Sequence, residues 1–168
     1  MVEKDRVFSG KLKQKGIYDF KEFYEFLYDY LTDENYDVFE TKYVEKVEGD
    51  AKNIEISWTA TREISDYFQF EISAYWIILG MKKVKVKKDN KEISMDSGTL
   101  EIKFTATLKK DYENRWESTP FLKFLRGVYD RYIIRSRVSD YEIKLFEEIN
   151  ELIAQSKSFL AIEGQHAI

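Results

Sequence analysis

The 168-residue sequence contains no cysteine, and its only histidine, His166, stands near the C-terminal end. The absence of cysteine excludes disulfide bonds, thiolate metal sites and cysteine nucleophiles. A histidine beside a frayed chain end is poorly placed to act as a general base or a metal ligand, so Ser/His/Asp catalysis is excluded as well. We therefore expect no catalytic residue, no metal and no cofactor. Whether the protein is an enzyme stays open, and the sequence favours a protein that is not.

The sequence also has few backbone-breaking residues and no long apolar run. It contains one proline, Pro120, and seven scattered glycines, none with the spacing of a phosphate-binding loop. The longest uncharged apolar run, residues 74–81, is much shorter than a membrane-spanning helix requires. The first ten residues are charged and lack the apolar region of a secretory signal. These features predict a cytoplasmic protein without a transmembrane segment.

Aromatic residues are abundant, with 12 Tyr, 12 Phe and 3 Trp, and they predict a folded chain with a large core. No linker or repeat divides the sequence, so we expect a single α+β domain over residues 1–168. The net charge of −4 hides a segregation of charge. Residues 19–50 contain eleven acids and three lysines, whereas residues 81–91 contain six lysines and one acid. Such segregation marks either a partner surface or segments that neutralise one another.

Helical and strand periodicities follow one another along the first two thirds of the chain. Asp19, with Glu22 three residues later, predicts the start of a helix over residues 20–31. Beyond residue 35, apolar residues alternate with polar ones, which is typical of an antiparallel sheet covered on one face. The expected strands are residues 7–13, 36–47, 54–61, 68–78, 82–88, 91–95 and 100–109. The sequence thus predicts a sheet of about six to seven strands.

The lysine-rich stretch KKVKVKK, residues 82–88, has two interpretations. In a strand, Val84 and Val86 would face inward and the alternating lysines outward, with a two-residue turn at Asp89 and Asn90. Lysines on a short strand also discourage association between sheet edges. The other interpretation is a surface that binds a polyanion. It has less support, because no aromatic residues interleave with these lysines.

The last third of the chain is predicted to be helical. Thr119 followed by Pro120 indicates a helix start. The apolar face of this helix includes Phe121, Leu122, Leu125, Val128, Tyr129 and Tyr132. Lys123, Arg126 and Arg137 are expected on the opposite, solvated side. Ser139 with Glu142 indicates a second start, so residues 139–162 are expected to form a C-terminal helical extension.

This order of elements, a strand, a helix, a run of antiparallel strands and a long helix, resembles that of the START-like helix-grip superfamily, which includes polyketide-cyclase-like proteins. The resemblance covers residues 5–135 and concerns topology alone. It implies a curved antiparallel sheet packed on a long C-terminal helix, with a lipid, sterol, polyketide or hormone between them. This chain differs in having one helix after the first strand and an extra C-terminal helix.

Three hypotheses for function remain open. The leading one is a non-enzymatic binder of a hydrophobic small molecule or lipid, in a cavity between the sheet and the helix over residues 120–135. The side chains expected to line that cavity are Trp58, Phe68, Phe70, Trp76, Phe104, Leu125, Val128, Tyr129 and Tyr132. The first alternative is a protein-interaction or self-association module using residues 140–162. A weaker alternative is an RNA or anionic-membrane surface binder using residues 82–91 and 126–137, with nucleic acid the less expected partner.

Overall fold

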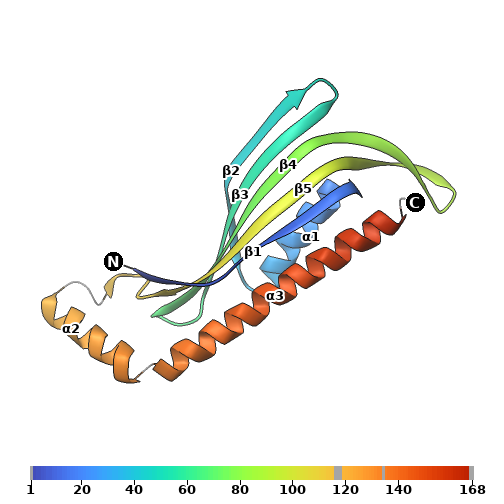
Figure 1. The fold of residues 1–168 in the computed structure, drawn as a ribbon. Helices are drawn as coiled ribbons and strands as arrows, with labels where there is room; N and C mark the ends of the chain where they lie inside the picture. The colour runs from blue at the N-terminus through green and yellow to red at the C-terminus, as the bar shows by residue number, and fades with distance from the viewer. Residues whose placement is uncertain (1, 116–118, 134, 167–168) are drawn as a thin grey trace.

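The computed structural model describes residues 2–115, 119–133 and 135–166, and over these residues it is an α+β fold with a five-stranded antiparallel sheet. The strands are β1 (Glu3–Tyr18), β2 (Asp37–Glu48), β3 (Ala51–Glu63), β4 (Phe68–Lys88) and β5 (Lys91–Lys110). The helices are α1 (Phe20–Asp33), α2 (Pro120–Val128), the π-helical segment η2 (Tyr129–Ile133) and α3 (Arg135–His166). The strand order is β1-β5-β4-β3-β2, and Figure 1 shows that the sheet is curved.

The predicted count of six to seven strands is wrong, because two pairs of expected strands are continuous. Residues 68–78 and 82–88 both belong to β4, and residues 91–95 and 100–109 both belong to β5. A bulge between Leu79 and Lys82 interrupts the β4–β5 register, and Gly80 there has a φ of 62°. A bulge shifts the alternation of side chains without ending the strand, so the break in periodicity suggested a boundary that does not exist.

The lysine-rich hairpin has the local structure that the sequence predicts. Asp89 and Asn90 have φ values of 52° and 62°, and Lys88 pairs with Lys91 across this two-residue turn. Val86 is buried, whereas the neighbouring Lys85 and Lys87 are exposed.

Three lysines of this stretch also have acidic partners inside the fold. The closest Nζ to carboxylate distances are 3.6 Å for Lys82–Asp50, 2.9 Å for Lys83–Asp96 and 3.8 Å for Lys85–Glu92. These contacts favour the structural interpretation of the lysines.

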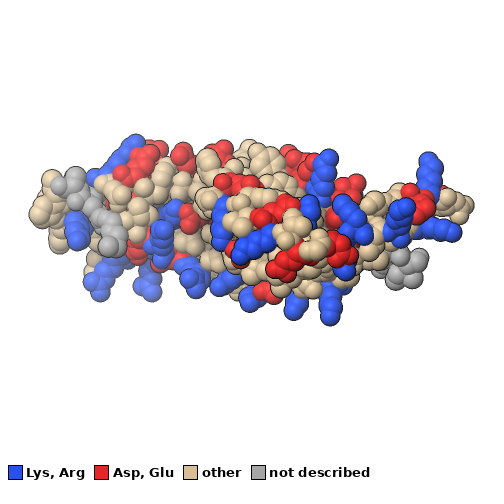
Figure 2. Space-filling model, turned by 90° about the horizontal axis from the view of Figure 1, so that it is seen from above, with Lys and Arg blue, Asp and Glu red and all other residues tan. Residues whose placement is uncertain are grey.

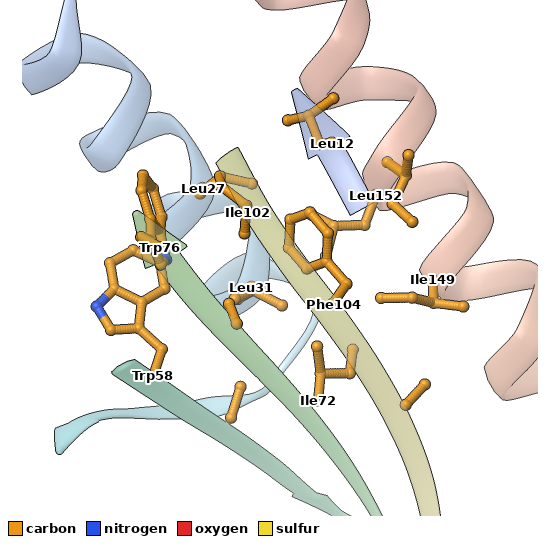
Figure 3. Packing of buried hydrophobic residues seen from close by; sticks show 14 of the residues in the cluster. Leu12, Leu27, Leu31, Trp58, Ile72, Trp76, Ile102, Phe104, Ile149 and Leu152 are labelled. Atoms are coloured by element: carbon orange, nitrogen blue, oxygen red, sulfur yellow. The ribbon is translucent and has the colours of Figure 1, made fainter. Parts of the chain in front are cut away.

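Helices α1 and α3 lie on the same face of the sheet (Figure 1). The Asp19 carboxylate accepts a hydrogen bond from Glu22 N at 3.0 Å, which confirms the predicted helix start. From α1, Phe23, Leu27 and Leu31 are buried against the sheet. The buried side chains of α3 in the same cluster are Leu145, Ile149, Leu152, Ile153 and Leu160. Figure 3 shows Ile149 and Leu152 beside Phe104 of β5.

The long helix that covers the sheet is therefore α3, which contains residues 139–162 but begins at Arg135, so the helix start expected at Ser139 is wrong. The expected packing of residues 120–135 on the sheet is not what the structure shows, because α2 extends away from one end of the sheet (Figure 1). Over the described part of the chain, none of the helices has the length and apolar character needed to cross a bilayer.

The opposite face of the sheet is not covered by the described helices (Figure 1). Ion pairs lie across it, including Lys42–Glu55 with 2.6 Å between Nζ and Oε2, and Lys11–Glu101 with 3.2 Å between Nζ and Oε1. Figure 2 shows acidic and basic side chains interleaved over much of the molecule seen from above. Such mixed charge is typical of a solvated sheet face.

Candidate binding surface on α2

A single buried arginine joins α2 to the end of the sheet. Arg126 is 7% exposed, and its Nη2 lies 3.2 Å from the Glu3 carboxylate at the start of β1. Its Nε donates a hydrogen bond to Tyr67 Oη at 3.3 Å. Its Nη1 lies 3.6 Å from Asp111 Oδ2, directly after β5, and Asp111 is 2% exposed. One guanidinium thus connects α2 to three separate parts of the sheet end.

The helical pattern predicts Arg126 on the solvated side of α2, and this prediction is wrong, because Arg126 is buried. Arg126 follows Leu122 by four residues and precedes Tyr129 by three, and both of these side chains are half-buried. Residues three and four apart share one helix face. This spacing was the signal that Arg126 belongs to the packed side, where a charge is stable only if it is paired.

The start of α2 has the predicted structure. Thr119 Oγ1 accepts a hydrogen bond from Leu122 N at 3.2 Å, and Pro120 occupies the first turn. The packed side of α2 reaches the sheet end through Tyr129, whose ring centroid lies 6.0 Å from that of Tyr67. A hydrogen-bonded start and a buried arginine together hold the helix in one position.

The other side of α2 is apolar and faces solvent. The exposed fraction of the side chain is 67% for Phe121, 65% for Phe124 and 36% for Val128. Tyr132, in the following segment η2, is 74% exposed. Phe121, Phe124 and Val128 are three and four residues apart, so they form one stripe along the helix. We call Phe121, Phe124, Val128 and Tyr132 the exposed aromatic stripe.

Two cationic side chains, Lys123 and Arg131, lie beside the exposed aromatic stripe. Lys123, Arg131, Arg135 and Arg137 are exposed, and the Arg131 guanidinium lies 5.8 Å from the centroid of the Tyr132 ring. An open hollow of about 390 Å³ is lined by Lys123, Phe124, Gly127, Val128, Arg131 and Tyr132. Its lining combines apolar surface with positive charge, which suits a ligand that has an apolar part and an anionic part.

A second open hollow, of about 380 Å³, lies on the packed side of α2. It is lined by Leu122 and Tyr129 of the helical segment and by Asp66, Tyr67 and Arg115 from the sheet end. Both hollows exceed the roughly 300 Å³ at which small-molecule sites begin. The α2 end therefore offers apolar, partly charged space on both sides of the helix.

The structure separates the residues of the predicted ligand site into two groups. Val128 and Tyr132 belong to the exposed stripe, whereas Leu125 and Tyr129 are half-buried on the same helical segment. The five sheet residues, Trp58, Phe68, Phe70, Trp76 and Phe104, are all buried in the core cluster. Tyr67 contacts a member of each group, with its ring centroid 5.0 Å from that of Phe68 and 6.0 Å from that of Tyr129.

The sheet residues of the predicted site are packed by rings and by the two covering helices. The ring centroids of Trp58 and Trp76 are 5.0 Å apart, and the Tyr24 ring of α1 lies 4.8 Å from that of Trp58 (Figure 3 shows the two tryptophans). Trp76 Nε1 is buried without a hydrogen-bond partner among the described residues. These side chains form close-packed core in this structure.

A smaller hollow lies between α1, α3 and β4. Its volume is about 130 Å³, and Tyr36, Glu148 and Leu152 are among its lining residues. Glu148 is held by Arg62, at 2.7 Å from Nη2 to Oε1, and by a hydrogen bond of 2.9 Å donated by Tyr36 Oη. Burial, reinforced by the Glu148 charge, raises the pKa of the Tyr36 phenol above its ordinary value. Tyr36 therefore stays protonated at neutral pH and acts as a hydrogen-bond donor.

The described residues contain no group of three or more histidine or acidic side chains arranged to hold a metal ion. The side chain of His166 lies outside the described part of the structure. No family model, no curated protein and no solved structure matches this chain.

Proposed function

We propose that this protein is a non-enzymatic binder of a lipid or another hydrophobic ligand, and that the ligand contacts α2. The observation that carries the proposal is the exposure of Phe121 and Phe124, at 67% and 65%, on a helix that is otherwise anchored. Contiguous exposed apolar side chains with a polar rim are characteristic of binding sites. The adjacent hollow of about 390 Å³ has room for part of such a ligand.

The proposed ligand is of the class expected from the sequence, a lipid or another hydrophobic molecule. The proposed site is on α2, and not in a cavity between the sheet and the helix over residues 120–135. We also propose a relationship to the START-like helix-grip superfamily. The strand order β1-β5-β4-β3-β2 and the long helix α3 across one face of the sheet support it. We propose that the ligand contacts Val128, Tyr129 and Tyr132 at the end of the sheet. Trp58 and Trp76 belong to the hydrophobic core and not to this site. A cytoplasmic location is proposed with it.

Self-association through residues 140–162 has less support from the geometry. Within this range Leu145, Ile149 and Leu152 are buried inside the chain and so are not offered to a partner. Among the described residues of α3, the large exposed apolar side chains are Ile143, Phe146 and Ile162. Phe146 also packs against Phe8 of β1, with 5.9 Å between the ring centroids. We therefore place the binding function on α2.

The test is a titration with oleate, used below its aggregation concentration and followed by calorimetry and native mass spectrometry. We expect saturable binding that the double variant Phe121→Ser/Phe124→Ser weakens roughly tenfold or more, because two exposed rings lose their apolar contact. The matched control, Val47→Ser/Leu79→Ser, removes side chains that are 66% and 52% exposed on β2 and β4. Equal loss in both variants, or no binding by the unaltered protein, contradicts the proposal.

A further inference from the structure

The exposed aromatic stripe and its cations are arranged as in a helix that lies in the surface of a membrane. Phe121, Phe124 and Val128 project from one side of α2, and Tyr132 continues that side in η2. Helices that bind in the interface have an apolar side with aromatic residues and cations along their polar flanks. A tyrosine carries a ring and a hydroxyl, which suits the level of the lipid headgroups.

The α2–η2 segment and the start of α3 carry mostly positive charge. Residues 119–137 contain five basic residues and one acid, Asp130. Arg126 is paired inside the fold, which leaves four exposed cations: Lys123, Arg131, Arg135 and Arg137. Anionic lipids attract each basic side chain that comes close to their surface. The segment therefore complements a negatively charged bilayer rather than a neutral one.

The rest of the molecule fixes which end would face such a surface. Residues 19–50, which form α1, β2 and their flanks, contain eleven acids and three lysines. Figure 1 shows α2 at one end of the molecule, extended away from α1 and from the β2–β3 hairpin. An anionic surface would attract the α2 end and repel the acidic part, so of these two parts α2 would face the surface.

The other cluster of cations does not have the same arrangement. Residues 81–91 of the β4–β5 hairpin contain six lysines and no aromatic residue, and three of these lysines have acidic partners. Positive charge without apolar surface gives weak binding that any polyanion can share. The hairpin therefore serves as a control for charge alone.

We propose that α2 and η2 dock on the surface of an anionic phospholipid bilayer. In this arrangement the exposed aromatic stripe enters the interfacial layer, and Lys123, Arg131, Arg135 and Arg137 contact the headgroups. The inference rests on the proposed function and names its partner. Arg126 acts as a positioning residue, because it holds the stripe outward from the sheet end.

The experiment is co-sedimentation of the full chain with vesicles of phosphatidylcholine alone or mixed with phosphatidylserine. We expect binding to the mixed vesicles that weakens as salt rises and is roughly tenfold or more weaker for Phe121→Ser/Phe124→Ser. Lys123→Gln/Arg131→Gln should weaken binding at low salt and reduce its salt dependence. Lys85→Gln/Lys87→Gln, which removes the same charge from the hairpin, should leave binding unchanged. Melting curves check that each variant is folded, and the exposed positions make this the expected result.

Comparing oleate binding with vesicle binding tests the bilayer inference and the proposed function separately. Saturable oleate binding without vesicle binding overturns the bilayer inference and leaves the proposed function standing, whereas absence of both overturns both. Equal loss of vesicle binding in the hairpin variant shows a charge effect alone and overturns the inference. Two rival occupants are tested with the same variants, single-stranded oligouridylate by titration and a second copy of the chain by light scattering. Binding of either one through Phe121 and Phe124, in place of vesicles, overturns the inference as well.

Discussion

The Arg126 guanidinium lies 3.2 Å from the Glu3 carboxylate, which joins α2 to the first residue of β1 across 123 positions of sequence. The same guanidinium faces Asp111 after β5 and Tyr67 before β4. This network explains how a helix can expose its apolar side and still hold a defined position.

Replacement of Arg126 by alanine should destabilise the fold. The change removes the cation that faces the Asp111 carboxylate, which is 2% exposed, and breaking a buried ion pair costs about 3 kcal/mol. The free energy of unfolding from urea titration measures the effect. Arg137→Ala removes an exposed charge and should change it by less than about 0.5 kcal/mol. Similar values for the two variants would show that Arg126 does not anchor α2.

Alanine should have opposite effects at two glycines. At Gly98 a Cβ would lie 2.9 Å from Leu79 O and 3.1 Å from Met81 Cα, beside the β4 bulge, so the backbone must move. We expect Gly98→Ala to cost about 1–3 kcal/mol, as overpacking does. At Gly127 in α2 no described atom outside the helix's own backbone lies within 4 Å of an added Cβ, and Gly127→Ala should stabilise by about 0.5–1 kcal/mol. Thermal unfolding of both variants gives the comparison, and a loss of stability at Gly127 would contradict the described helix.

Phe104→Ala should be one of the most destabilising single substitutions. Phe104 is 0% exposed and lies between the sheet and α3, so its removal leaves a cavity in close-packed core. Large-to-small changes of this kind cost about 3–5 kcal/mol. Phe39→Ala on β2, where the ring is 58% exposed, is the control and should cost well under half as much. Comparable costs at both sites would argue against the placement of β5 at the centre of the core.

Stability should fall at alkaline pH through Tyr24, a partly buried residue of α1. Burial, followed by the hydrogen bond to Glu40, raises the pKa of Tyr24 from 10.0 to about 12. Because the folded-state pKa is the higher one, the unfolded chain loses this proton first, and the stabilisation present below pH 10 is lost as pH rises toward 12. Melting temperatures of Tyr24→Phe should therefore decline less between these pH values than those of the unaltered protein. A parallel decline in the two proteins would rule out Tyr24 as a contributor.

Local signals in the sequence predicted the elements more accurately than their arrangement. Asp19 and the Thr119–Pro120 pair marked real helix starts, because capping depends on residues within one turn. The Asp89–Asn90 turn was correct for the same reason. The strand count failed at Gly80, since a bulge and a strand end interrupt the alternation of side chains in the same way.

The site was harder to predict because periodicity does not say which surface covers which. Apolar side chains recur with similar helical spacing in residues 120–132 and in α3. Even so, α3 covers the sheet, whereas α2 exposes Phe121 and Phe124. The sheet residues Trp58 and Trp76 were correctly expected on the inward face, and the facing helices are α1 and α3. Arg126 shows the same limit, because its partners Glu3 and Asp111 are distant in sequence.

Hydrogen–deuterium exchange with and without phosphatidylcholine–phosphatidylserine vesicles, and in a parallel series with oleate, tests most directly whether ligands contact α2. If ligands bind at α2, exchange of amides in residues 120–133 slows when either probe is added, with little change in β3 and β4 around Trp58 and Trp76. Slower exchange confined to β3 and β4, with α2 unchanged, would place the ligand between the sheet and its covering helices and contradict the account.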